Sequence, residues 1–347
     1  MVRPKRLKLI LILPAGALCL LFLLLYSDQS RKRRIIVKKQ YLLMGTLVEI
    51  QLVCPASGEE AALRAIRAAR EEISRLEDLM SPYRPESDIS RVNREAALHP
   101  VVVSTDTFQV LKRSLAVSEK TDGAFDISFA PVGRLWRLDP ENPRIPTGEE
   151  IESTLALVDF RNILLDGEKR SVAFAREGMA IDLGGIAKGT AVNRAVKVVR
   201  GHGFEDVLVN AGGDLFALGK NAEGKPWRIG IRDPRDKTRF IEKIEVSDRA
   251  VVTSGDYERM VEIEGTRYHH IMDTKTGRPA EKCISVTIVS GDPELADALS
   301  TALFVLGPEK GLELVEQMPD VEALIVDPAL AIHATKGFDI PPGKTLQ

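Results

Sequence analysis

An apolar run over residues 9–26, with clusters of basic residues on both sides, constrains this chain more than any other feature. At about 1.5 Å per residue, a helix of that length just crosses a hydrocarbon layer of about 30 Å. A cleaved signal peptide is the alternative, but residues 23–28 offer no clean small-x-small cleavage site. We therefore expect a basic N-terminal segment over 1–8, a transmembrane anchor over 9–26 and a basic linker over 27–39.

The remaining residues, 40–347, contain no repeat, low-complexity tract or Pro/Ser-rich hinge, so we expect one continuous unit. A hydrophobic content of 44% is enough for a substantial core. The net charge of -2 supplies no broad attraction for a polyanion, so nucleic acid is not expected as a partner. Outside the anchor, Cys54 and Cys283 give no disulfide framework and no metal-ligand spacing, although one bridge between them stays open.

Local patterns predict helices mixed with hairpin-like strands. Apolar residues at helical spacing predict helices over 58–80, 105–120, 186–200 and 293–306. Alternating or β-branched segments predict strands over 41–53, 207–210, 227–231, 241–246, 267–272 and 285–289. This mixture favours an α+β fold with mixed or antiparallel sheets and flanking helices over a regular doubly wound sheet.

A glycine-rich segment, Asp-Leu-Gly-Gly-Ile-Ala-Lys-Gly at 182–189, is predicted to lead from a strand into a helix. Glycine lets the backbone approach a phosphate, and the free amides at a helix start favour an anion. A tight turn without a ligand explains the glycines about equally well. A P-loop is excluded because Lys188 precedes Gly189 rather than Ser or Thr, and the dinucleotide pattern G-x-G-x-x-G is absent.

Two further patterns carry possible chemistry. Asp297 and Thr301 lie four residues apart on a predicted helix, so their hard oxygens share one face and suit magnesium. In isolation, a solvent-facing Asp and a Thr bonded to its own helix explain that spacing more simply. Of His269 and His270 in a strand-like segment, only one can face a given side. Histidine is the usual group that takes a proton from a hydroxyl, and an exposed histidine without a role is the alternative.

Eight blocks in a fixed order resemble the ApbE family of FAD:protein FMN transferases, from residue 44 to about 307. These are Met44-Gly45-Thr46, Met80 to Tyr83 with Ser87 and Asn93, Thr121 to Asp126, Asp182 to Gly189, Asn210 to Asp214, Thr253 to Tyr257, His270 to Asp273, and Ala296 to Thr301. The resemblance implies an ApbE-like, T-fold-like catalytic unit over 40–347. The chain departs from the family pattern at Thr190, Asn193 and Thr274.

What the resemblance implies is an enzyme that cleaves FAD, attaches FMN through its phosphate to a Thr or Ser hydroxyl, and releases AMP with the help of Mg²⁺. His270 matches the histidine that activates the acceptor hydroxyl. The positions that match flavin and adenine contacts are Met44, Tyr83, Gly123, Ala124, Phe125, Asp126, Asp182, Lys188 and Ile271. The positions that match metal ligands are Asp297, Thr301 and the backbone carbonyl of Gly185.

The resemblance also implies a partner and a location. The expected acceptor is a membrane redox subunit with a motif resembling Asp/Ser-Gly-Ala/Ser-Thr. An FAD pyrophosphatase, in which water replaces the acceptor, and an FAD-binding module remain as alternatives. The flanking charges do not set the orientation of the anchor, because both flanks are basic. Since the family usually works outside the cytoplasm, we expect a single-pass inner-membrane protein with a periplasmic catalytic domain.

Overall fold

A computed structural model describes residues 34–338, 340 and 344–346. Its main element is an eight-stranded sheet with the strand order β1-β2-β6-β7-β10-β13-β14-β15, in which all neighbours are antiparallel. The strands are β1 (Arg34–Leu43), β2 (Thr46–Pro55), β6 (Val207–Ala211), β7 (Asp214–Leu218), β10 (Arg249–Gly255), β13 (Ser285–Ser290), β14 (Val321–Val326) and β15 (Ile332–Ala334). The predicted α+β class with antiparallel sheets is confirmed.

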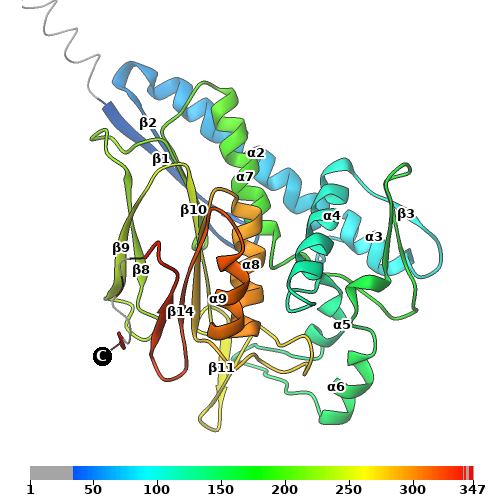
Figure 1. The fold of residues 1–347 in the computed structure, drawn as a ribbon. Helices are drawn as coiled ribbons and strands as arrows, with labels where there is room; N and C mark the ends of the chain where they lie inside the picture. Colours follow the sequence, from blue (N-terminus) through cyan, green and yellow to red (C-terminus); the bar gives the residue numbers. More distant parts are fainter. Residues whose placement is uncertain (1–33, 339, 341–343, 347) are drawn as a thin grey trace, which may run out of the picture.

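Each face of the large sheet is covered by a different layer (Figure 1). Helices α2 (Glu59–Met80), α7 (Ala187–Gly201), α8 (Pro293–Leu306) and α9 (Pro308–Glu316) pack on one face. A two-stranded ribbon of β8 (Trp227–Arg232) and β9 (Phe240–Val246) covers the other. Strand β2 shows the cause, because Val48, Ile50 and Leu52 belong to the core under the helices while Val53 belongs to the core under the ribbon.

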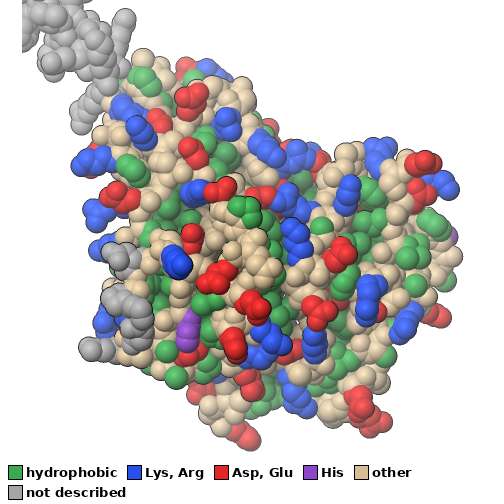
Figure 2. Space-filling model, viewed as in Figure 1, with side chains coloured by type: hydrophobic (Ala, Val, Ile, Leu, Met, Phe, Trp, Pro, Cys, Tyr) green, Lys and Arg blue, Asp and Glu red, His purple; other side chains and the backbone are tan. Residues whose placement is uncertain are grey.

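Strand β2 pairs with β6 although residues 56–206 separate them, and most of that segment forms a second lobe beside the helices (Figure 1). The lobe contains α3 (Asp88–Glu95), β3 (Val101–Val102), α4 (Thr105–Lys120), α5 (Ala130–Gly133), α6 (Gly148–Leu155), β4 (Ile163–Asp166) and β5 (Ser171–Phe174), with 3₁₀ turns at Ile127–Phe129 and Phe160–Asn162. A hairpin of β11 (Met260–Ile263) and β12 (Thr266–His269) projects from the end of β10. On the face in Figure 2, basic and acidic side chains are interspersed over both parts.

The helix predictions are confirmed, since 105–120 and 293–306 match α4 and α8, and 58–80 and 186–200 match α2 and α7 to within one residue at each end. The single strand predicted over 41–53 is wrong. It is the β1–β2 hairpin, whose two-residue turn has φ of 53° at Met44 and 69° at Gly45. Such a turn is usually signalled by Asn-Gly, so a Met in the first position conceals it.

The segment before the glycine-rich turn is not a strand either, although we predicted one. Residues 179–183 lie in no sheet. Instead, the Asn93 side chain accepts a hydrogen bond from the Ile181 N–H at 2.7 Å and donates one to the Ile181 carbonyl at 2.9 Å. One side-chain amide therefore supplies the partners that a neighbouring strand would have supplied.

Strand β1 begins at Arg34, inside the segment 27–39 that we expected to be a linker, and its Val37 is buried opposite Leu52 in the β1–β2 pair. The anchor predicted over 9–26 lies outside the described residues. Within the described part, no helix combines the length and the apolar character needed to span a bilayer. Cys54 and Cys283 are both buried free thiols, so the bridge left open by the sequence is not formed.

Candidate active site

The glycine-rich segment approaches α8 most closely at Gly189, in the first turn of α7. A Cβ at this position would lie 2.3 Å from the carbonyl oxygen of Pro293 and 2.9 Å from Cβ of Asp297, so only glycine allows the two helices to approach this closely. The Gly189 N–H donates to Oδ2 of Asp297 at 2.9 Å. The turn and the carboxylate are therefore fixed against each other by backbone.

Lys188 lies between two buried carboxylates at the same point. Its Nζ is 2.5 Å from Oδ2 of Asp214, the first residue of β7, and 3.2 Å from Oδ1 of Asp297 on α8. Both carboxylate side chains are 2% exposed. Burial acts to lower the pKa of Lys188, but the two carboxylates outweigh it and raise that pKa, so the ammonium stays protonated. Burial, and then the charge of Asp297, raise the pKa of Asp214.

The residues predicted to bind metal converge beside this cluster. Thr301 follows Asp297 by one turn of α8, and a Cβ on Gly185 would lie 3.4 Å from Oγ1 of Thr301. A carboxylate, a hydroxyl and a backbone carbonyl are oxygen ligands of the kind that Mg²⁺ prefers. Among the residues that the structure describes, no three His, Cys, Asp or Glu side chains form a metal-binding group. The predicted set contains only one such side chain.

The segment 121–126 wraps around the turn from the second lobe. Gly123 has φ of 73°, and the side chains of Ala124 and Phe125 are buried in the main core. The Asp126 carboxylate accepts bonds from Ser128 N at 2.8 Å, Ser128 Oγ at 2.6 Å and Phe160 N at 2.9 Å. Burial raises the pKa of Asp126 against these hydrogen bonds. In this structure Asp126 therefore shapes the segment.

Hydrogen bonds from Asp182 and Thr274 connect residues 123–127 to neighbouring segments. The Asp182 N–H donates to the carbonyl of Ile127 at 2.9 Å, and Oδ1 of Asp182 accepts from Gly184 N at 2.6 Å. Thr274 donates its hydroxyl to the Gly123 carbonyl at 2.7 Å. Thr274 thus ties the loop after His270 to the segment predicted to contact FAD.

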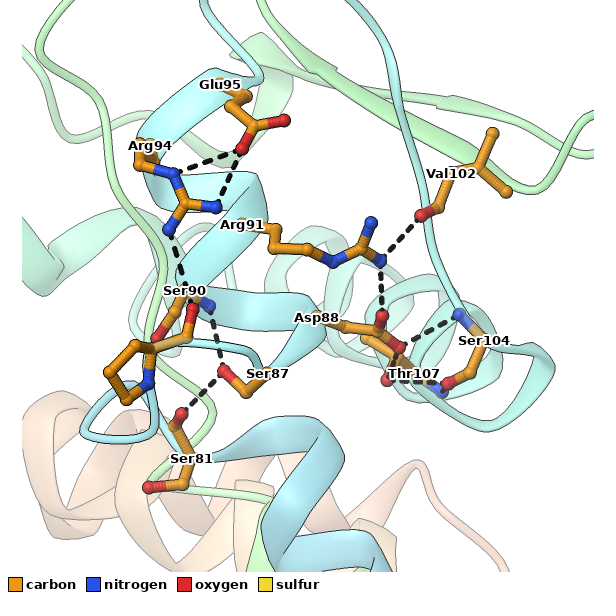
Figure 3. Close-up of polar contacts among 11 residues, drawn as sticks. Ser81, Ser87, Asp88, Ser90, Arg91, Arg94, Glu95, Val102, Ser104 and Thr107 are labelled. Atoms are coloured by element: carbon orange, nitrogen blue, oxygen red, sulfur yellow. Dashed lines mark hydrogen bonds and ion pairs between the residues drawn. The ribbon is translucent and has the colours of Figure 1, made fainter.

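Tyr83 projects from the loop between α2 and α3, where its side chain is 88% exposed. The base of that loop is held by Ser87, whose Oγ donates to the Ser81 carbonyl at 2.7 Å and accepts from Ser90 N at 3.0 Å as the cap of α3 (Figure 3). The loop therefore has a fixed base and presents an aromatic ring that is free to stack on a ligand.

The next residue, Asp88, joins α3 to α4 (Figure 3). Its buried carboxylate accepts bonds from Arg91 at 2.6 Å, from Ser104 N at 2.9 Å and from the Thr107 hydroxyl at 2.8 Å. Burial alone would raise the pKa of Asp88, but these hydrogen bonds outweigh it and lower that pKa. The network supports the Tyr83 loop rather than forming a site of its own.

His270 follows β12 and has an exposed side chain, whereas His269 is buried, with Nε2 3.0 Å from the Ala280 carbonyl oxygen. The alternation expected for the pair is therefore present. Desolvation by the surrounding protein, then the charge of Arg259, lower the pKa of His270 to about 4, and Lys188 contributes a smaller effect. The lowered pKa makes the neutral imidazole the stable form of His270 near pH 7.

The two hairpin turns at this end of the sheet, β1–β2 and β6–β7, lie against each other. Gly212 N donates to the Leu47 carbonyl at 3.1 Å, and a Cβ on Gly212 would lie 2.3 Å from Thr46 Oγ1. Met44, half-buried in the first turn, is thereby held near the strand that begins with Asp214.

Two residues of this region were not given a role by the sequence. Asp214 ends the quoted block Asn-Ala-Gly-Gly-Asp, so its signal was present, but nothing indicated that it contacts Lys188. Arg259 gave no signal. Its guanidinium would lie 3.5 Å from a Cβ on Gly45, and its carbonyl accepts from His270 N at 3.1 Å.

Ile271 and two aspartates of the quoted blocks have structural explanations. Ile271 is buried, and its carbonyl accepts from Ala280 N at 2.9 Å. Asp273 accepts two backbone N–H bonds within its own turn, as expected for a turn-forming Asp. Asp256 is paired with Arg235 by two bonds of 2.7 Å, away from Lys188. Two shallow surface hollows, at β4–β5 and at β9–β14, include none of the predicted site residues.

Known proteins are similar in sequence to most of this chain. The model of the ApbE family matches residues 44–325. Proteins named FAD:protein FMN transferase from Treponema pallidum (strain Nichols) and Klebsiella pneumoniae (strain 342) are each 35% identical, over 318 and 287 residues. These alignments cover 86% and 82% of this chain and 86% and 87% of the relatives.

Solved structures are similar over nearly their whole length. The crystal structure of the ApbE protein from Thermotoga maritima has a TM-score of 0.80 at 35% identity. The flavin transferase ApbE from Vibrio cholerae has a TM-score of 0.77 at 31% identity. Each match covers 88% of this chain and 98% of the other.

Proposed function

Because this chain belongs to the ApbE family and is an FAD:protein FMN transferase, we propose that His270, Lys188 and a magnesium site at Asp297 carry out the transfer. The observation that carries this proposal is the contact between Lys188 on α7 and Asp297 on α8. The lowered pKa of His270, to which the charge of Lys188 makes a small contribution, supports its assignment as the base.

The reaction needs an oxygen nucleophile in line with the bond that breaks. The hydroxyl oxygen of the acceptor Thr or Ser forms a bond to the flavin-side phosphorus, and the bond from that phosphorus to the bridging oxygen breaks. The bridging oxygen leaves on AMP. His270 takes the hydroxyl proton, which suits an imidazole that is neutral at pH 7. No electron is transferred, so the flavin oxidation state does not change.

Charge on the pyrophosphate must be balanced during this step. Asp297, Thr301 and the Gly185 carbonyl would hold Mg²⁺, which supplies that neutralisation when bound. Lys188 adds a permanent positive charge at the start of α7, where the helix dipole also favours an anion.

The FAD contacts remain proposals of the same kind. We assign them to Met44 and Tyr83 on one side and to the 123–126 segment, Asp182 and Ile271 on the other. The exposed ring of Tyr83 on a firmly held loop suits stacking on a flavin or adenine ring. The bond from Thr274 to Gly123 keeps the His270 loop in register with this segment.

The acceptor and the location extend the proposal. We assign the acceptor to a membrane redox subunit with a motif resembling Asp/Ser-Gly-Ala/Ser-Thr, and the enzyme to the inner membrane through residues 9–26, with its catalytic part in the periplasm. Protease added to spheroplasts should then remove the catalytic part while leaving a cytoplasmic marker intact. Protection of the catalytic part until detergent is added would contradict this orientation.

The decisive experiment combines a purified chain that begins shortly before Arg34 with FAD, MgCl₂ and an acceptor domain containing Asp-Gly-Ala-Thr. Mass spectrometry should detect one added FMN on the acceptor, together with an equal amount of AMP, and a chelator should abolish both. His270→Ala should bind FAD and lose transfer by about 10²–10⁴-fold, while His99→Ala, a change at an exposed histidine, should remain active. AMP and free FMN without a mass gain would instead identify a pyrophosphatase.

A further inference from the structure

Asp214 is the one carboxylate of the Lys188 cluster that has no part in the proposed metal site. It is 2% exposed, it begins β7 directly after the Gly212-Gly213 turn, and its Oδ2 lies 2.5 Å from Nζ of Lys188. A buried, unpaired carboxylate destabilises the folded protein, so the contact to Lys188 offsets the desolvation of Asp214. Asp214 is thus a second carboxylate on Lys188, besides Asp297.

Both carboxylate oxygens of Asp297 already have a hydrogen-bond donor. Its Oδ2 accepts the Gly189 N–H at 2.9 Å, and its Oδ1 is 3.2 Å from Nζ of Lys188. A magnesium ion binds carboxylate oxygens at about 2.0–2.1 Å. An ammonium and a divalent cation on the same carboxylate repel each other, so metal binding at Asp297 competes with the Lys188–Asp297 contact.

We propose that Asp214 is a positioning residue that holds the Lys188 ammonium when a metal ion takes Asp297. In the metal-free protein Lys188 is shared between two carboxylates, and with metal bound it rests on Asp214 alone, still inside the site and facing the pyrophosphate. This inference rests on the proposed metal site. It predicts that Lys188 weakens metal binding and that Asp214 relieves this effect.

A double-mutant cycle tests the inference, with the dissociation constant of Mn²⁺ or Mg²⁺ for the FAD-free protein measured by calorimetry. Lys188→Met should tighten metal binding, because the competing cation is gone. Asp214→Asn should weaken it by about tenfold, because Lys188 then has only Asp297 to bind. In the Lys188→Met background, Asp214→Asn should have little further effect.

The double-mutant cycle distinguishes this mechanism from a general effect of the Asp214 charge on metal affinity. If Asp214 only adds negative charge to the site, Asp214→Asn will weaken metal binding equally in both backgrounds, and the inference is wrong. It is also wrong if Lys188→Met fails to tighten binding, a result that stands even where Asp214→Asn does not fold. Asp256→Asn is the matched control, since it removes another buried, paired carboxylate and should leave the metal constant unchanged.

One more variant tests the proposed metal site separately from the role inferred for Asp214. Asp297→Ala should abolish metal binding. If the wild-type protein binds no metal, or Asp297→Ala binds it as well as the wild type, the metal site itself is wrong and the inference falls with it. If Asp297→Ala loses the metal while the cycle is additive, the metal site stands and only the role of Asp214 is rejected.

Discussion

At the scale of single residues, Met44 and His270 are both held in states that they would not adopt in a free peptide. Met44 has φ of 53°, in the left-handed region that side chains with a Cβ avoid. His270 has a pKa lowered to about 4 by desolvation and by Arg259. Residues kept in unfavourable states cluster at functional sites, where the surroundings enforce them.

The pKa of His270 determines how activity depends on pH. Its neutral form is the base, so activity falls when pH drops through the pKa. An ordinary histidine, at about 6.5, would halve kcat/KM near that pH. Here kcat/KM should stay level from pH 8 to about 6 and fall only below that, since the pKa is lowered. Arg259→Gln removes a positive charge and should move the fall to higher pH. A half-loss near pH 6.5 in the wild type would contradict the lowered pKa.

Met44 should show a conflict between stability and binding. Asn tolerates a positive φ better than Met, so Met44→Asn should raise the free energy of unfolding by about 1 kcal/mol and weaken FAD binding. Urea unfolding and FAD fluorescence titration measure the two effects. Glu264→Asn is the control, because Glu264-Gly265 forms the same kind of turn, with φ of 51° and 77°, in the β11–β12 hairpin. That variant should leave FAD affinity unchanged, and equal losses in both would argue against a contact to Met44.

At the scale of elements, the crossing of α7 and α8 assembles the site, and it depends on Gly189. Lys188, Gly189 and Asp297 are all at this contact. The apolar spacing in the sequence predicts both helices correctly, but spacing describes one helix at a time. It contains no information about which turn of one helix meets which turn of another, so the crossing could only be seen in the structure.

Gly189→Ala should therefore be far more harmful than an ordinary Gly-to-Ala change in a helix. Its Cβ would collide with the Pro293 carbonyl, and we expect a loss of about 1–3 kcal/mol of unfolding free energy. Gly201→Ala, at the other end of α7 with open space around it, should be neutral or stabilising by up to about 1 kcal/mol. Chemical denaturation of both variants checks this. Similar unfolding free energies for the two variants would mean that α7 and α8 can move apart without loss of stability.

At the scale of the whole molecule, the sequence predicts most elements and the family but not where they pack. The order of blocks identified the relatives. The spacing predicted that Asp297 and Thr301 share one helix, which α8 confirms, whereas their role as metal ligands was predicted only from the resemblance. Asp214 was missed because its partner is 26 positions away in the chain, and no local pattern reports such a contact. The β1–β2 hairpin was missed because Met44 has a positive φ in its turn, where Asn or Gly is the usual signal. Both failures concern the candidate site, because Met44 and Asp214 belong to the two hairpin turns that lie against each other there.

We expect that a shortened chain must keep strand β1 to fold normally. Beginning at Arg34 keeps all of β1, whereas beginning at residue 44 removes it, together with the buried side chains of Val37 and Leu43. Each such side chain contributes about 1.5–3 kcal/mol, and β2 would become an exposed edge prone to association. The shorter chain should melt at a clearly lower Tm and aggregate in size-exclusion chromatography. Equal Tm values would show that β1 is dispensable.

The position of α8 in the chain has a consequence for biosynthesis. Lys188 and Asp297 are 109 positions apart, and the Thr301 hydroxyl comes later still. A nascent chain that has not yet emerged beyond residue 301 can have a complete β1–β2 hairpin and a complete second lobe, yet it lacks the carboxylate and the hydroxyl of the proposed metal site. If the proposed metal site is required, products that end before residue 297 lack both side chains and should not transfer FMN.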